Sequence, residues 1–262
     1  MCDSINRVFE RRFKRGKCAG QRSIEHPWLS ERPEPPPGHV VILANGVWSN
    51  PETILRLAGD ADAIIAADGA WAKAKQLGID VSLVVGDLDS IGEEEAKQLA
   101  DSSVPTLAFP VDKDRTDTEI AVDLALEWRV PRISICGVGG GRMDHALGHA
   151  FLLGKCPASQ ESEARLELVS GSETAVWVEG EIELNGACLG DRVSILPIDF
   201  AVRVSTTGLR FPLTNELLHR PAGRGISNAV CALPARVRIC EGAAIVIHNR
   251  PHRASGAEPP GR

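Results

Sequence analysis

Acidic residues gather directly after one predicted strand. The apolar run Leu83-Val84-Val85 is typical of a buried parallel strand, and the segment Gly86-Asp87-Leu88-Asp89-Ser90 follows it. Asp87 and Asp89 alternate at the strand tip, where two carboxylates repel each other unless one takes up a proton or a cation lies between them. Mg²⁺ prefers such hard oxygen ligands and usually binds one or two carboxylates together with substrate phosphates. By itself the segment is compatible with a magnesium site and equally with a solvated acidic turn.

A second acidic segment, Asp112-Lys113-Asp114-Arg115-Thr116-Asp117, ends at a predicted helix start. Thr116 and Glu119 have the spacing of a capping box, and the following turns carry a helical apolar stripe of Ile120, Ala121, Leu124, Ala125 and Trp128. Asp117 then falls in the first turn, where the helix dipole stabilises an anion by about 0.3–1 kcal/mol. Lys113 offers a point charge for a phosphate. Together, the two acidic segments favour a cation and phosphate site over two unrelated turns.

A glycine-rich segment follows the next predicted strand, Ile133-Ser134-Ile135, and reads Gly137-Val138-Gly139-Gly140-Gly141-Arg142-Met143-Asp144-His145. Glycines let backbone N–H groups approach phosphate oxygens, and the Arg142 guanidinium can donate to them in pairs. The order of residues is not that of a P-loop, and the spacing is not that of a dinucleotide fingerprint. His145 and His149 lie four residues apart on a predicted helix, but without a nearby third ligand they favour surface or packing roles over zinc.

Six motifs, in this order along about residues 40–248, resemble those of the thiamine pyrophosphokinase (thiamine diphosphokinase) family. They are Ala67-Asp68-Gly69-Ala70, Gly86-Asp87-Leu88-Asp89-Ser90, Lys113-Asp114-Arg115-Thr116-Asp117, Gly141-Arg142-Met143-Asp144-His145, Ser205-Thr206-Thr207-Gly208-Leu209-Arg210-Phe211-Pro212-Leu213 and Arg224-Gly225-Ile226-Ser227-Asn228. The chain departs from the family at Ala70, where a second glycine is common and a methyl narrows the approach to a nucleotide. The segment before residue 39 is the other departure.

The resemblance implies that the hydroxyl of thiamine attacks the β-phosphorus of ATP, giving thiamine diphosphate and AMP. It implies that Asp87, Asp89 and Asp117 hold Mg²⁺ and, with Asp144, act as catalytic residues. Which carboxylate accepts the hydroxyl proton stays open, and Asp144 could orient either the nucleotide or Arg142. The implied ATP-binding residues are Asp68, which also supports the metal cluster, with Gly69, Lys113, Thr116 and Arg142.

For thiamine, the resemblance implies that Phe211 stacks on the aminopyrimidine ring and that Ser227 and Asn228 contact the ring edge. From the residues alone, Phe211 could instead be a core aromatic, and Asn228 could be a turn residue.

Two other functions remain open at this point. The first is a pyrophosphokinase that acts on another hydroxymethyl heterocycle, such as a pterin, because the metal and nucleotide motifs do not encode the acceptor. The second is a non-catalytic protein that binds nucleotide or thiamine. The segments Ser205–Leu213 and Arg224–Asn228 favour thiamine, and the many mutually repelling carboxylates favour catalysis over binding alone.

The predicted elements that position these residues follow two different patterns along the chain. From His39 to about Leu153, short apolar strands alternate with helices, which predicts an α/β domain with a parallel sheet covered on both faces. Ligands of such sheets bind beyond the carboxyl ends of the strands, so Asp68, Asp87, Asp89 and the Gly137 loop can share one rim. After about residue 165, short strands bounded by Gly, Pro, Asn and Asp predict a small all-β sandwich. The resemblance implies that this domain binds thiamine and helps to form a homodimer.

Composition limits the class of protein. The chain has 262 residues, 43% hydrophobic and 24% charged, and its apolar runs are too short to span a bilayer, so no membrane association is expected. Residues 1–38 hold eight Lys or Arg and five acidic residues, a net charge of +3. Since the whole chain has a net charge of −6, the remaining residues carry −9, which argues against nucleic acid as a partner. Seven scattered cysteines fit a reducing, cytoplasmic location.

The predicted domain organisation has four parts. Residues 1–38 form a disordered, basic and Pro-rich leader, and residues 39–160 form the α/β ATP-binding catalytic domain. Residues 165–250 form the β-sandwich thiamine-binding domain, and residues 251–262 form a disordered tail.

Overall fold

The computed structural model describes residues 38–88, 91–110, 112, 114–159 and 164–251. The predicted leader and tail, Asp89 and Lys113 therefore lie outside the described residues, apart from Gly38 and Pro251. In chain order the first elements are β1 (His39–Leu43), α2 (Pro51–Gly59), β2 (Ala63–Ala67), α3 (Ala70–Gln76), β3 (Leu83–Gly86), α4 (Glu93–Ala100), β4 (Thr106–Ala108), α5 (Asp117–Glu127), β5 (Arg132–Cys136), α6 (Met143–Leu152), η1 (Leu153–Lys155) and β6 (Arg165–Ser170).

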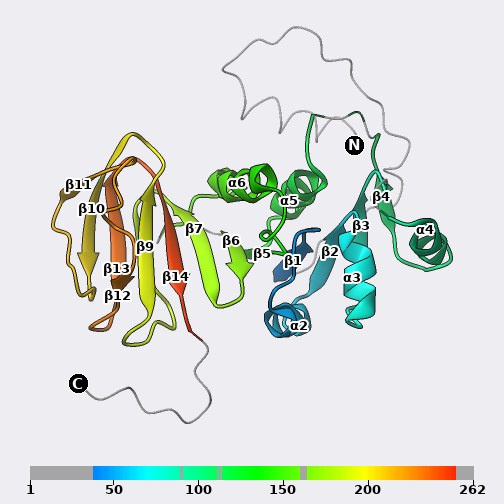
Figure 1. Cartoon of the computed structure of the whole chain (residues 1–262), viewed down its shortest axis with the longest axis horizontal. Helices are drawn as coiled ribbons and strands as arrows, with labels where there is room; N and C mark the ends of the chain where they lie inside the picture. The colour runs from blue at the N-terminus through cyan, green and yellow to red at the C-terminus, as the bar shows by residue number, and fades with distance from the viewer. Residues whose placement is uncertain (1–37, 89–90, 111, 113, 160–163, 252–262) are drawn as a thin grey trace, which may run out of the picture. The chain divides into compact units, whose positions relative to one another are not determined.

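The remaining elements are strands: β7 (Glu173–Val178), β8 (Glu181–Glu183), β9 (Arg192–Pro197), β10 (Ala201–Thr207), β11 (Glu216–His219), β12 (Asn228–Ala229), β13 (Arg236–Glu241) and β14 (Ala244–Asn249). The strands form two sheets (Figure 1). A ten-stranded sheet has the order β12-β9-β14-β7-β6-β5-β1-β2-β3-β4, and a four-stranded sheet has the order β11-β10-β13-β8. The predicted α/β fold followed by a small β-sandwich is confirmed.

The parallel part of the large sheet consists of β6-β5-β1-β2-β3-β4. Helices cover both of its faces (Figure 1), with α5 and α6 on one side and α2 and α3 on the other. In β1, Val40 and Ile42 belong to the apolar cluster that contains α5, while Val41 and Leu43 belong to the cluster that contains α2 and α3. Burial on both faces explains why the sequence of this strand is continuously apolar.

Several elements were not predicted. Helix α4 is rich in charged residues (Glu93, Glu94, Glu95 and Lys97), and Leu99 is its buried residue. Strand β6 pairs parallel with β5 and extends the parallel part as far as Ser170. Strand β7 then pairs antiparallel with β6, so the same sheet continues into the strands of the sandwich. The division into domains at about residues 160–165 stays a prediction.

The sandwich core lies between the two sheets. Burial alternates along β7, β9 and β10, as expected when one face of each strand packs inward. The inward side chains include Val176, Val178, Val193, Ile195 and Val246 of the large sheet and Val202, Val204, Val237 and Ile239 of the small one. Among the described residues, no helix has the length and apolar character needed to cross a membrane.

Candidate active site at the carboxyl edge of the parallel sheet

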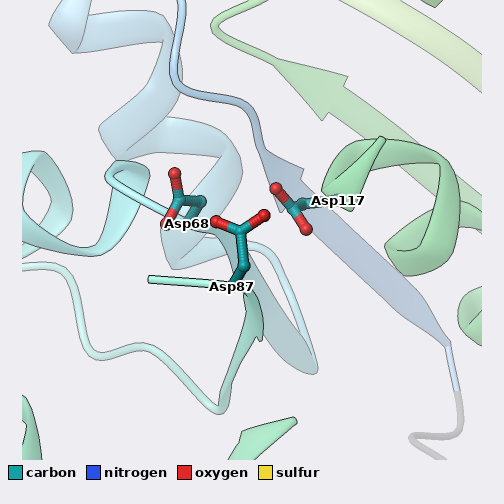
Figure 2. Close-up of side chains that lie close together, drawn as sticks. All are labelled: Asp68, Asp87 and Asp117. Atoms are coloured by element: carbon teal, nitrogen blue, oxygen red, sulfur yellow. The ribbon is translucent and has the colours of Figure 1, made fainter. Parts of the chain in front are cut away.

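Three aspartates converge at the carboxyl edge of the parallel sheet. Asp68 follows β2, Asp87 follows β3, and Asp117 opens α5 (Figure 2). One carboxylate oxygen from each lies within 4.8 Å of those of the other two. Strands β2 and β3 are parallel neighbours, so the residues that follow them meet at the same edge. The predicted shared rim is therefore observed for Asp68 and Asp87, and α5 brings Asp117 to it.

The close approach of Asp68 to Asp87 depends on Gly86. A Cβ added to Gly86 would lie 3.0 Å from Cβ of Asp68 and 3.1 Å from its Cα, tighter than most real Cβ contacts. The backbone N–H of Asp68 donates to the carbonyl of Val85 at 2.8 Å, which joins the two strand tips. Asp68 has a φ of 50°, a left-handed conformation that aspartate tolerates better than most residues. Such conformations cluster at functional sites.

The helix that carries Asp117 starts where predicted, and the Thr116 half of the expected capping box is observed. The Thr116 hydroxyl accepts a hydrogen bond from the backbone N–H of Glu119 at 3.1 Å and caps α5. The Glu119 carboxylate pairs with Lys155 at 2.9 Å. Thr116, expected at the ATP site, is exposed at this helix start beside the aspartate cluster.

The donor set of the cluster fits a divalent cation. Three carboxylates gathered within such a short range repel one another, and Asp68 is almost buried, with 8% of its surface exposed. Hard carboxylate oxygens are the ligands that Mg²⁺ prefers. Two residues of the predicted site, Asp89 and Lys113, lie outside the described residues, and the three described aspartates include Asp68, which the resemblance placed in a supporting role.

The glycine-rich loop that follows β5 packs against the loop that follows β1. The backbone N–H of Gly46 donates to the carbonyl of Gly137 at 2.8 Å, and that of Val47 donates to Gly139 at 2.7 Å. Gly137 and Gly140 have φ values of 72° and 73°, which explains glycine at these two positions.

Arg142 and Asp144 form a pair at the end of the glycine-rich loop. The Arg142 guanidinium donates to both carboxylate oxygens of Asp144, at 3.1 and 2.6 Å. This hydrogen bond lowers the pKa of Asp144 below its usual value. Both side chains are largely exposed, so solvent screens the pair and little stability depends on it. Of the two roles open to Asp144, the observed contact is the one with Arg142.

The Asp68 motif continues into α3. Gly69 is buried directly before the helix. Ala70 is fully buried and belongs to the apolar cluster that contains α2 and α3. The expectation that its methyl narrows the approach of a nucleotide was therefore wrong, because this methyl packs in the core.

The residues expected to bind thiamine lie together on the sandwich. Phe211 is 63% exposed, so the alternative of a core aromatic is wrong. Asn228, in β12, is 6% exposed, and its amide pairs with the backbone of Phe211: Oδ1 accepts from Phe211 N at 3.0 Å, and Nδ2 donates to Phe211 O at 2.7 Å. Ser227 is exposed, has a φ of 59°, and donates its N–H to Ser194 Oγ at 3.0 Å. In this structure Asn228 thus holds the backbone of Phe211, and its contact with the thiamine ring stays a prediction.

Sequence reasoning missed Lys73. Its amine donates to the carbonyls of Asn45 and Gly46, both at 2.9 Å, and burial lowers the pKa of the amine. Lys73 belongs to none of the motifs, and its partners lie 28 and 27 residues earlier in the chain. A local pattern carries no signal for such a contact.

Two family models match this chain. The model described as "Thiamin pyrophosphokinase, catalytic domain" matches residues 54–166. The model described as "Thiamin pyrophosphokinase, vitamin B1 binding domain" matches residues 180–241. The first match contains the aspartate cluster and the glycine-rich loop, and the second contains Phe211, Ser227 and Asn228.

Individual proteins agree with these matches. The chain is 30% identical to the thiamine pyrophosphokinase of Bacillus subtilis (strain 168) over 132 residues, 50% of this chain and 60% of that protein, so less than two thirds of this relative is matched. The solved Bacillus subtilis enzyme shares the fold with a TM-score of 0.71 and 24% identity, covering 82% of this chain and 100% of that one. The yeast enzyme gives 0.67 and 18%, covering 81% and 86%. With both family models matched in sequence order, this chain belongs to the thiamine pyrophosphokinase family.

Proposed function

We propose that this protein transfers diphosphate from ATP to the hydroxyl of thiamine in a Mg²⁺-dependent reaction that yields thiamine diphosphate and AMP. The observation that carries the proposal is the aspartate cluster, in which oxygens of Asp68, Asp87 and Asp117 lie within 4.8 Å of one another at the ligand-binding edge of a parallel sheet. The choice of thiamine as the acceptor is inferred from family membership, because the aspartate cluster alone is equally compatible with other nucleotide-dependent reactions.

In this proposal the acidic residues bind the metal ion, and backbone N–H groups and basic side chains bind the phosphates. Asp68, Asp87 and Asp117, with Asp89, hold Mg²⁺, which would offset the charge on the non-bridging oxygens of ATP when bound. Backbone N–H groups of the glycine-rich loop and the side chains of Arg142 and Lys113 bind the phosphates, and Gly69 and Thr116 lie beside them. Asp144 orients Arg142. Diphosphate transfer depends mainly on such positioning and charge neutralisation, and it needs no covalent help from the protein.

Thiamine recognition falls to the sandwich. The exposed ring of Phe211 stacks on the aminopyrimidine, and the exposed Ser227 contacts the ring edge. Asn228 contributes by holding the backbone of Phe211 through its buried amide.

The strand order supports the proposal of a homodimer. Seven strand-to-strand steps separate β12, which carries Asn228, from β2, which ends at Asp68. At about 4.8 Å a step, these strands lie roughly 34 Å apart along the sheet, too far for one small substrate to contact both. We therefore propose that Phe211 of one copy faces the aspartate cluster of a second copy, so that each active site needs two chains.

The proposed location of the protein is the cytoplasm, because its seven scattered cysteines fit a reducing environment.

The decisive experiment measures AMP release by the purified chain with ATP, Mg²⁺ and a panel of hydroxyl acceptors that includes thiamine and a hydroxymethyl pterin. AMP and thiamine diphosphate should form in equal amounts with thiamine, and EDTA should stop the reaction. AMP release with the pterin alone would favour the other acceptor class. Binding of ATP and thiamine with no AMP from any acceptor would favour a non-catalytic protein.

A further inference from the structure

The amine of Lys73 lies at a junction between two segments of the proposed nucleotide site. Lys73 is on α3, the helix that follows Asp68, and it donates to the carbonyls of Asn45 and Gly46, both at 2.9 Å. These carbonyls belong to residues 44–48, here called the β1 loop because it follows β1. A cation that gives up part of its hydration needs such acceptors in return, so the contact ties the β1 loop to α3.

The β1 loop in turn holds the glycine-rich loop. Strand β1 lies between β5, which precedes the glycine-rich loop, and β2, which precedes Asp68. The N–H groups of Gly46 and Val47 donate to the carbonyls of Gly137 and Gly139 at 2.8 and 2.7 Å. The packing is close: a Cβ at Gly46 would overlap the Gly137 carbonyl oxygen and lie 2.8 Å from that of Gly139.

A continuous chain of contacts therefore runs from α3 through the β1 loop to the glycine-rich loop and Arg142. We propose that Lys73 is a positioning residue for ATP, which sets the glycine-rich loop at the correct distance from the aspartate cluster. The proposal rests on the function proposed above. Its simplest rival is that Lys73 only satisfies two loop carbonyls and contributes to stability alone.

The kinetic test compares Lys73→Met with Lys75→Met. Methionine keeps the apolar stem of the lysine but donates no hydrogen bond. Lys75 lies on the same helix and is the matched control, because its amine contacts Gln98 at 2.7 Å and lies over the Trp71 ring, away from the β1 loop. Lys73→Met should raise the KM for ATP about tenfold, equivalent to about 1.4 kcal/mol, with the KM for thiamine unchanged. Lys75→Met should leave both values at the wild-type level, and Lys73→Arg, which can still donate to two carbonyls, should recover most of the loss.

A second measurement does not depend on turnover. Hydrogen exchange at the amides of Gly46 and Val47, without ATP, should become faster in Lys73→Met and stay at the wild-type rate in Lys75→Met, while amides in the core of β1 exchange as in the wild type. If Lys73→Met does not fold, Lys73→Gln is measured in the same way.

The outcomes separate the two proposals. A wild-type chain that forms no thiamine diphosphate overturns the proposed function, and the exchange result then still tests the loop contact. An active wild type whose Lys73→Met variant keeps its KM for ATP overturns the positioning role. Equal changes in both KM values, or a lower melting temperature with unchanged KM values, also overturn it.

Discussion

At the scale of single residues, the candidate site is a cluster of three carboxylates, with one oxygen of each within 4.8 Å of those of the other two. Asp87 and Asp117 are half-buried and Asp68 is almost buried, so their mutual repulsion is only partly screened. A divalent cation bound among the three carboxylates would turn this repulsion into attraction, and an amide in place of one of them would bind the cation more weakly.

The first prediction concerns the proposed metal ligands. Asp87→Asn and Asp89→Asn should each lower turnover by at least about a hundredfold, because an amide oxygen binds Mg²⁺ more weakly than a carboxylate. Without metal the Asp87→Asn variant should melt no lower than the wild type, since the change relieves like-charge repulsion with Asp68 and Asp117. Steady-state kinetics and thermal melts with and without EDTA check both statements. Near-normal turnover in both variants would contradict the metal assignment.

The second prediction separates thiamine contact from positioning. Phe211→Ala should raise the KM for thiamine roughly three- to tenfold with the KM for ATP unchanged, because a lost stacking contact contributes about 0.5–1.5 kcal/mol. Its exposure means that the melting temperature should hardly change. Asn228→Ala should raise the same KM but also lower the melting temperature, since it removes two partly buried hydrogen bonds to the backbone of Phe211, each of which contributes about 0.5–1.5 kcal/mol. A rise in both KM values for Phe211→Ala would place the thiamine site elsewhere.

At the scale of elements, the ends of parallel strands decide where chemistry is possible. The carboxyl ends of β2 and β3 carry the aspartates, and those of β1 and β5 carry the two loops that pack together. The amino end carries a different polar cluster: Glu167 accepts hydrogen bonds from Arg132, Arg165 and Ser134, and Ser134 contacts His39 at 2.9 Å. Burial opposes ionisation of Glu167, but Arg165 and Arg132 outweigh it, so its pKa lies below the usual value.

The third prediction tests the contact between β2 and β3. Gly86→Ala should lower both turnover and the melting temperature, because its Cβ would press on Asp68 at 3.0–3.1 Å and separate Asp68 from Asp87. Gly59→Ala is the matched control, since a Cβ there meets nothing within 4 Å. The binding of Mg²⁺ by the folded variants, measured by calorimetry, should weaken in Gly86→Ala alone. Unchanged affinity would show that the strand tips accommodate the methyl.

The fourth prediction concerns pH and His39, at the start of β1. Burial, followed by the nearby Arg132, lowers the pKa of His39 below 6.5, while Asp60 and Glu167 oppose this shift. The unfolded chain then takes up the proton first, so the contribution of His39 to stability is present above pH 6.5 and is lost as the pH falls through the lower folded value. The melting temperature should therefore fall between pH 7 and 5.

The variant that checks this statement is His39→Gln, which should make the melting temperature less dependent on pH in that range. His219→Gln, a change at an exposed histidine, serves as the control. An unchanged pH dependence in His39→Gln would assign the effect to other groups, of which His149 and His248 also have pKa values lowered by burial.

At the scale of the whole molecule, one continuous ten-stranded sheet contains both β2 and β3, which end at the aspartate cluster, and β12, which carries Asn228 of the proposed thiamine site. The aspartates and Phe211 lie near opposite parts of the ten-stranded sheet, because β7, β14 and β9 are inserted between β12 and the parallel strands. A rigid sheet cannot fold back on itself to bring them together, which is the physical reason for proposing a site shared between two chains.

The fifth prediction tests the shared site by mixing two variants. Asp87→Asn and Phe211→Ala, unfolded together and refolded at equal amounts, should recover about a quarter of wild-type turnover at low thiamine, because half of the dimers are mixed and each has one intact site. Each variant refolded alone is the control. A mixture no more active than the average of the two controls would mean that each site lies within one chain.

The sequence by itself determined the local structure and most of the candidate chemistry. Apolar runs predicted the strands of the parallel sheet, the Thr116–Glu119 spacing predicted the start of α5, and acidic residues after strands predicted the rim where Asp68 and Asp87 lie. These features depend on neighbours in the chain, so their signals are local. Strand β6 and helix α4 were missed because their patterns are weak without the packing that surrounds them.

Only the tertiary structure decided which distant segments meet. The order β5-β1-β2-β3 places the glycine-rich loop, the β1 loop and the aspartates side by side. Long-range contacts assigned Lys73 to the β1 loop, Asn228 to the backbone of Phe211, and the methyl of Ala70 to the core. Strand order and side-chain packing depend on the free energy of the whole fold, and no window of sequence contains both partners of such contacts.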